Sequence, residues 1–193
     1  MSGEISQVVV YRGHEKNPLF GPYAQDVEKR ITLFKELNLH REANGKRGWT
    51  VVSIAGEELV DKLKGMCPEE TLLSIPAGPT SKLDAVFSIT EATFIKDEFF
   101  SKGGRGCFTC GAAYWATSKR IYKDLSIIQT SKLSLFDGIS EGPLCPYPGN
   151  EYKVGFYTEA VRLHDGENEC TSYLGGGGSF LFEEGVQKVK VLA

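Results

Sequence analysis

The sequence has no surplus of basic residues, few cysteines and no long apolar run, and each absence excludes a class of protein. Its 193 residues contain 22 Lys and Arg against 25 Asp and Glu, a net charge of −3. A nucleic-acid partner is therefore not expected, because binding phosphates needs an excess of basic side chains. Apolar runs such as the one ending at Tyr11 are far shorter than a membrane span, so no membrane partner is expected either.

The five cysteines are irregularly spaced, and no segment at the amino terminus resembles a signal peptide. An odd number of cysteines without the regular spacing of a disulfide framework is typical of a reducing compartment, so we expect a cytoplasmic protein. A chain of this length buries enough surface to fold without disulfides or a metal. With no internal repeat or linker, we expect a single domain over residues 1–193.

The first 120 residues alternate between strand and helix patterns. Strand patterns cover 5–12, 49–54, 71–75 and 105–109, and helical patterns cover 23–38, 57–64, 92–101 and 111–118. This alternation predicts an α/β fold with a doubly wound, mostly parallel sheet and helices on both faces. Beyond residue 124, β-type segments separated by Gly, Pro and Asp turns predict extra antiparallel strands in the C-terminal half.

One segment places a cysteine where a predicted strand meets a predicted helix. Cys110 follows a short strand and is followed by the small residues Gly111 and Ala112. This is the pattern of a nucleophile elbow, in which a sharp turn lifts the nucleophile above the sheet edge. The helix start would favour the thiolate form of the sulfur. A buried structural cysteine explains the pattern equally well.

Five segments of the chain agree in order and spacing with one family. They are VVYRG at 9–13, LSIPAG at 73–78, CGAAYWA at 110–116, FDGISEGP at 136–143 and YLGGGGSF at 173–180. Together they resemble the biotin-protein ligase N-terminal domain family, within the class I glutamine amidotransferase-like superfamily. No ligase catalytic domain precedes Ala193, so we expect a standalone amidotransferase-like protein. The resemblance implies a flavodoxin-like sheet with Cys110 above its carboxyl edge, where open α/β sheets bind ligands.

The resemblance also implies which backbone groups would serve acyl transfer to Cys110. The N–H groups of Gly78 and Gly111 would stabilise the developing oxyanion, although Gly78 taken alone could be a simple turn glycine. Tyr114 on the elbow helix is a candidate binding residue. Gly176 and Gly177 would allow close approach of a ligand to the backbone.

The chain departs from the family pattern at the general base. Working amidotransferases carry a histidine and a glutamate after a late strand, but here the glycine run 175–178 occupies that place. His40 and His164 are interpreted as a solvated residue and a hairpin residue. His14 follows the first strand and is the candidate base, with Glu15 as its orienting group or an alternative acid. Glutaminase activity of the usual kind is not expected.

Several interpretations of these residues stay open. Cys107 and Cys110 form a Cys-x-x-Cys, although redox motifs place both sulfurs at a helix start. A regulatory disulfide between Cys110 and Cys145 is unsupported but left open. No second Cys-x-x-Cys or histidine pair completes a zinc site, so we expect no metal and no cofactor.

Two classes of function remain. One is a cysteine-dependent hydrolase or amidase acting on a small polar substrate, and the other is a catalytically silent small-molecule-binding or regulatory module. A homodimer is compatible with both.

Overall fold

The computed structural model describes residues 4–15, 22, 24–122, 127–142, 158–164, 169–175 and 179–181. The chain divides into two compact units. The first comprises Met1–Ala116 with Ser131–Leu135, and the second comprises Thr117–Thr130 with Phe136–Ala193. The single domain over residues 1–193 stays a prediction.

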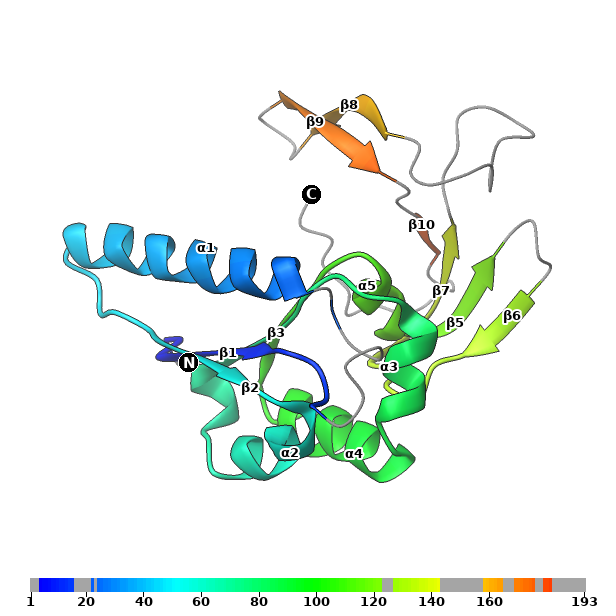
Figure 1. Cartoon of the computed structure of the whole chain (residues 1–193), viewed down its shortest axis with the longest axis horizontal. Coiled ribbons are helices and arrows are strands. Elements are labelled where there is room, and N and C mark those ends of the chain that lie inside the picture. Colours follow the sequence, from blue (N-terminus) through cyan, green and yellow to red (C-terminus); the bar gives the residue numbers. More distant parts are fainter. Residues whose placement is uncertain are drawn as a thin grey trace. The chain divides into compact units, whose positions relative to one another are not determined.

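The first unit is built on a four-stranded parallel sheet (Figure 1). Its strands are β1 (Gln7–Tyr11), β2 (Thr50–Ile54), β3 (Thr71–Ile75) and β4 (Arg105–Phe108). The strand order is β2-β1-β3-β4, and every neighbouring pair is parallel. This order is that of a flavodoxin-like doubly wound sheet. The chain adds β2 on one side of β1 and then adds β3 and β4 on the other side, so the order of the strands reverses between β1 and β3. The predicted fold class is confirmed.

Helices connect these strands and extend beyond them. They are α1 (Ala24–Ala43), α2 (Gly56–Lys64), α3 (Thr80–Val86), α4 (Ile89–Thr93) and α5 (Gly111–Trp115). A 3-10 turn (Pro68–Glu70) precedes β3, and a π-helical segment (Phe94–Phe100) continues α4. Among the described residues, no helix has the length and apolar character needed to cross a membrane.

Strand β1 separates two hydrophobic cores, because successive side chains of a strand point to opposite faces. Val8 and Val10 are fully buried in a cluster with Phe34 of α1. Val9 and Tyr11 are fully buried in the larger cluster that also contains residues of α2, α3, α4 and α5. Figure 1 shows α1 on one side of the sheet and α2 and α4 on the other. The helices therefore cover both faces, as predicted.

The second unit consists of strands. They are β5 (Thr117–Tyr122), β6 (Ile127–Thr130), β7 (Phe136–Gly142), β8 (Thr158–His164), β9 (Glu169–Gly175) and β10 (Ser179–Leu181). Four of them form a sheet in the order β10-β7-β5-β6, and β8 pairs with β9. All these pairs are antiparallel except β5 with β7, which is parallel. The expected antiparallel strands are present, with one parallel pairing among them.

Several helix boundaries differ from those predicted, and the carboxyl ends of α1 and α5 differ by several residues. The helix expected over 111–118 ends at Trp115, because Thr117 begins β5 and its hydroxyl group forms a hydrogen bond of 2.9 Å with the Ser140 hydroxyl group. Helix α1 extends to Ala43, so the exposed His40 lies on the helix rather than beyond it.

Candidate functional site

The carboxyl ends of the parallel strands bring three of the predicted site residues to one edge of the sheet. His14 follows β1, Gly78 follows β3 and Cys110 follows β4. Strands β3 and β4 are direct neighbours, and the Thr109 N–H donates to the Ile75 carbonyl oxygen at 3.2 Å. The turn that holds Cys110 therefore lies beside the turn that holds Gly78.

Cys110 adopts a strained backbone conformation at the turn between β4 and α5. Its φ of 55° and ψ of −127° lie in a region that residues with a Cβ rarely occupy. The N–H of Ala113 donates to the Cys110 carbonyl oxygen at 2.9 Å, which begins the helix immediately after the cysteine. The Cys110 residue is exposed and forms no disulfide with another described cysteine. A reactive thiol in this position would be accessible to a substrate at the sheet edge.

Gly111 is packed so closely that no side chain fits there. A Cβ at this position would lie 2.1 Å from the Gly78 carbonyl oxygen and 3.1 Å from the Thr80 backbone nitrogen. The buried Thr80 hydroxyl group donates to the Gly111 carbonyl oxygen at 2.5 Å. The structure thus brings Gly78 and Gly111 together, and their role as oxyanion donors stays a prediction.

His14 packs toward the opposite side of β1 from Cys110. Its Nδ1 shares a hydrogen bond of 2.7 Å with the Tyr11 hydroxyl group, and its ring centroid lies 5.2 Å from that of Phe87. A Cβ on Gly56, which begins α2 after β2, would lie 2.1 Å from His14 Cε1. Strands β1 and β4 are separated by two strand spacings, about 9.5 Å. Within the described residues, no hydrogen bond joins the His14 ring to Cys110.

The environment of His14 favours its neutral form. Burial lowers the pKa of His14, an effect that the negative charges of Glu57 and Glu91 oppose. Burial also raises the pKa of Tyr11, and here the same two carboxylates act in the same direction. At neutral pH the imidazole is therefore uncharged and the phenol is protonated, so the hydrogen bond between them joins two neutral groups.

Of the remaining predicted site residues, the structure describes Glu15 and Tyr114. Glu15 is exposed and forms an ion pair of 2.5 Å with Arg12. Tyr114 lies on α5 and is half-buried. Gly176 and Gly177 lie outside the described residues.

The structure describes Cys107 of the Cys-x-x-Cys interpretation but not Cys145 of the disulfide interpretation. Cys107 lies in β4, is half-buried, and, like Cys110 and Cys67, is a free thiol. Cys145 lies outside the described residues, so a disulfide between Cys110 and Cys145 stays untested.

Arg30 is a residue at this edge that sequence reasoning missed. Its Nη1 donates to the Cys107 sulfur at 3.6 Å, and its Nη2 donates to the Thr109 hydroxyl oxygen. A charged residue of an amphipathic helix normally faces solvent, so the pattern gave Arg30 no role. A signal was nevertheless present, because Arg30 falls three residues after Val27 and four before Phe34, the two buried residues of α1.

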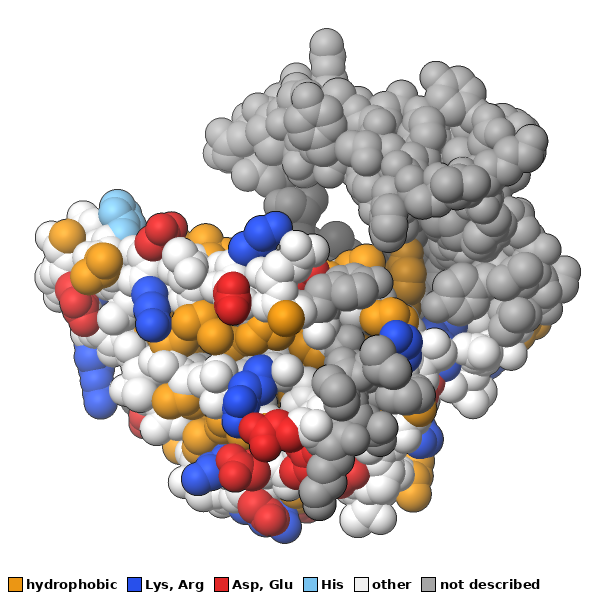
Figure 2. Space-filling model, viewed as in Figure 1, with side chains coloured by type: hydrophobic (Ala, Val, Ile, Leu, Met, Phe, Trp, Pro, Cys, Tyr) orange, Lys and Arg blue, Asp and Glu red, His pale blue; other side chains and the backbone are white. Residues whose placement is uncertain are grey.

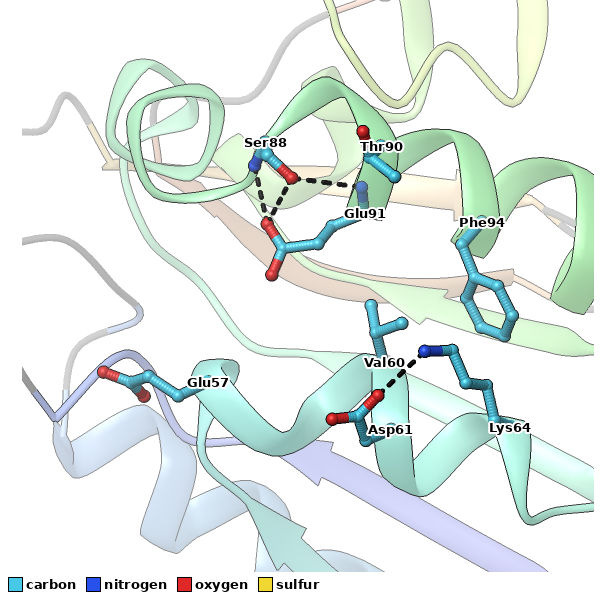
Figure 3. Close-up of a pocket in the computed structure, with 8 residues that line it drawn as sticks. All are labelled: Glu57, Val60, Asp61, Lys64, Ser88, Thr90, Glu91 and Phe94. Carbon is cyan, nitrogen blue, oxygen red and sulfur yellow. Dashed lines mark hydrogen bonds and ion pairs between the residues drawn. The ribbon is translucent and has the colours of Figure 1, made fainter.

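A surface groove lies between α2 and the start of α4 (Figure 3). Its lining residues are Glu57, Val60, Asp61, Lys64, Ser88, Thr90, Glu91 and Phe94. Lys64 donates to Asp61 at 2.8 Å, and Ser88 and Glu91 bond each other in the capping box that begins α4. Figure 2 shows acidic side chains gathered over α2 on this face of the molecule. These mutual bonds are typical of a solvated surface.

Comparison with known families identifies the chain. A family model described as "Biotin-protein ligase, N terminal" matches residues 49–193, which include Gly78 and Cys110 but neither His14 nor Arg30. No curated protein and no solved structure matched the chain. Since the family match covers well over half of the sequence, the chain belongs to the biotin-protein ligase N-terminal domain family, and this membership indicates an amidotransferase-like domain.

Proposed function

We propose that the chain is a class I glutamine amidotransferase-like protein in which Cys110 is the nucleophile for cleavage of a small polar amide or ester. The observation that carries this proposal is the conformation of Cys110. A cysteine at a positive φ, exposed between a parallel strand and a helix, has the geometry that a nucleophile elbow requires. Such strained residues persist where the surrounding structure holds them, and they cluster at active sites.

The proposed reaction proceeds in two steps. The Cys110 thiolate attacks the substrate carbonyl carbon, forms an S–C bond, and moves the carbonyl π electrons onto oxygen. The N–H groups of Gly78 and Gly111 stabilise this oxyanion. Collapse of the intermediate breaks the bond to the amine or alcohol, which leaves with a proton and gives a thioester. Attack of water on the thioester then releases the acid and restores the thiol.

His14 is the proposed base for these proton transfers. Its neutral state leaves it able to accept a proton, although the pKa lowered by burial makes it a weaker base than a solvated imidazole. Strand β3 lies between β1 and β4, a separation of about 9.5 Å, so His14 would act through a chain of waters or through a substrate group. Glu15, which is exposed and paired with Arg12, is the alternative acid.

A specific observation favours a second candidate, a silent small-molecule-binding module. Within the described part of the chain, the Cys110 sulfur has no hydrogen-bond partner, and the His14 ring is bonded to Tyr11 instead. A pocket that keeps its cysteine but lacks an adjacent base would bind a ligand without turning it over.

Acylation by p-nitrophenyl acetate distinguishes the two candidates. The hydrolase proposal predicts release of p-nitrophenol together with an acetyl group on the peptide containing Cys110, detected by mass spectrometry. Cys110→Ala should abolish both signals. Cys67→Ala is the matched control, because it removes another exposed thiol of the same chain and should change neither signal. Equal acetylation of Cys67 and Cys110, without turnover, would favour the binding module.

A further inference from the structure

Arg30 brings a positive charge to the carboxyl edge of the sheet, where no carboxylate of the described residues pairs with it. The partners of its guanidinium among the described residues are a thiol, on Cys107, and a hydroxyl group, on Thr109. A guanidinium has five N–H donors, so about three remain for another acceptor. Arg30 is also half-buried, and a charge withdrawn from water is normally paired with an opposite charge.

A second unpaired polar group lies on the same face of the sheet. Ser74 is fully buried, and its hydroxyl oxygen has no hydrogen-bond partner among the residues that the structure describes. Ser74 is the register partner of Cys107, so the two side chains share a face. Leu72, two residues earlier, packs in the cluster beneath α1, which identifies that face. Buried hydroxyl groups are normally bonded, so this polar patch is incomplete without a further partner.

We infer that Arg30 and Thr109 bind a carboxylate group, and that the substrate attacked by Cys110 is a small amide or ester carrying that carboxylate. The inference rests on the proposed function and names the substrate class of the same site. Because the Thr109 oxygen accepts a hydrogen bond from Arg30, its own O–H is available to donate to the anion. Thr109 directly precedes Cys110, so the bound anion lies beside the attacking sulfur.

Two pairs of alkylating agents test this inference without knowledge of the natural substrate. Iodoacetate and iodoacetamide differ only in the carboxylate, and 3-bromopropionate and 3-bromopropionamide repeat the comparison with a longer spacer. The rate of alkylation at Cys110 is measured by peptide mass spectrometry for the wild-type chain, Arg30→Gln and Lys29→Gln. Lys29 is exposed on the same helix, so its substitution removes the same charge from the solvent side.

The quantity compared is the rate of Cys110 alkylation by the acid reagent of a pair divided by the rate with its amide. For at least one pair, Arg30→Gln should lower this acid-to-amide ratio about tenfold or more, because the substitution removes a charge-assisted hydrogen bond to the carboxylate. Lys29→Gln should change the ratio by at most about twofold, because exposed charges are screened. An unchanged ratio in Arg30→Gln for both pairs overturns the inference while leaving the proposed function intact. Failure of iodoacetamide to label Cys110 in folded protein that is labelled at Cys67 refutes the proposed function, and the inference with it.

A measurement on the wild-type chain covers the case in which Arg30→Gln does not fold, as judged by circular dichroism. If Arg30 binds the carboxylate, added potassium chloride screens its charge. The acid-to-amide rate ratio at Cys110 should then fall toward the ratio measured for the unfolded chain. A ratio at low salt that already equals the ratio in the unfolded chain overturns the inference.

Discussion

Substitution of Gly111 by alanine is expected to displace the turn that carries Cys110. The added Cβ would lie 2.1 Å from the Gly78 carbonyl oxygen, whereas ordinary contacts begin at 3.4 Å, so the two segments must separate by about 1.3 Å. The obstructing atom belongs to the backbone and cannot rotate away. Overpacking of this kind costs about 1–3 kcal/mol, and the better helix propensity of alanine recovers at most about 1 kcal/mol. The net destabilisation should therefore be about 0–3 kcal/mol.

The displacement should affect reactivity more than stability. An error of about 1 Å in the position of a reacting group can lower a rate about 100-fold, so acylation of Cys110 by p-nitrophenyl acetate should be largely lost in Gly111→Ala. Urea unfolding measures the loss of stability. Gly65→Ala is the control, because the Cβ there would meet only the Lys62 carbonyl oxygen at 3.5 Å. If Gly111→Ala matched Gly65→Ala in both measurements, the close packing of Gly111 against Gly78 would not govern the site.

Three further outcomes are expected. Burial lowers the pKa of His14 in the folded protein, so as the pH falls the imidazole is protonated in the unfolded chain before it is protonated in the folded one. The stability from His14 is therefore complete above a pH of about 6.5 and is lost as the pH falls below it. Wild-type protein should lose more stability than His14→Gln between pH 8 and pH 5 in thermal unfolding, and equal losses would contradict this. Asp84→Ala should cost about 1–3 kcal/mol in urea unfolding, because Asp84 accepts a hydrogen bond of 2.7 Å from the indole N–H of the buried Trp115. Asp84→Asn, which keeps an acceptor oxygen, should cost less, and an equal cost would show that this bond is not responsible. Iodoacetamide at neutral pH should label Cys110 before Cys67, and the reverse order would show that the turn does not activate its sulfur.

The parallel sheet could be predicted because three of its four strands, β1, β2 and β3, are short runs rich in apolar residues with clear ends. The run 71–75 is followed by Pro76, which cannot continue the hydrogen-bond ladder of a strand, and β3 ends at Ile75 as predicted. Cys110 was likewise placed at the strand–helix junction, because small residues follow a β-type segment. These features depend on local sequence, which a single chain displays directly.

Helix α3 could not be found by hydrophobic periodicity. Its seven residues bury only Thr80 and Leu83, which is too few to form an apolar stripe. The preceding Pro79 at the N-cap was the available start signal. The role of Arg30 was hidden for a different reason, because its contacts with Cys107 and Thr109 join segments almost eighty residues apart.

The assignment of a base to Cys110 depends on the lateral order of the strands, which the sequence does not display. The β/α alternation places the ends of all four strands at one edge, and from it His14 was expected to be the nearest ionisable residue. In the observed order, β3 lies between β1 and β4, so the turn containing Gly78 separates His14 from Cys110. A substrate that reaches both residues must therefore lie across that turn. Arg30 approaches β4 from α1 instead, so a carbonyl group attacked by Cys110, as proposed, would have this cation on one side and the neutral imidazole of His14 on the other.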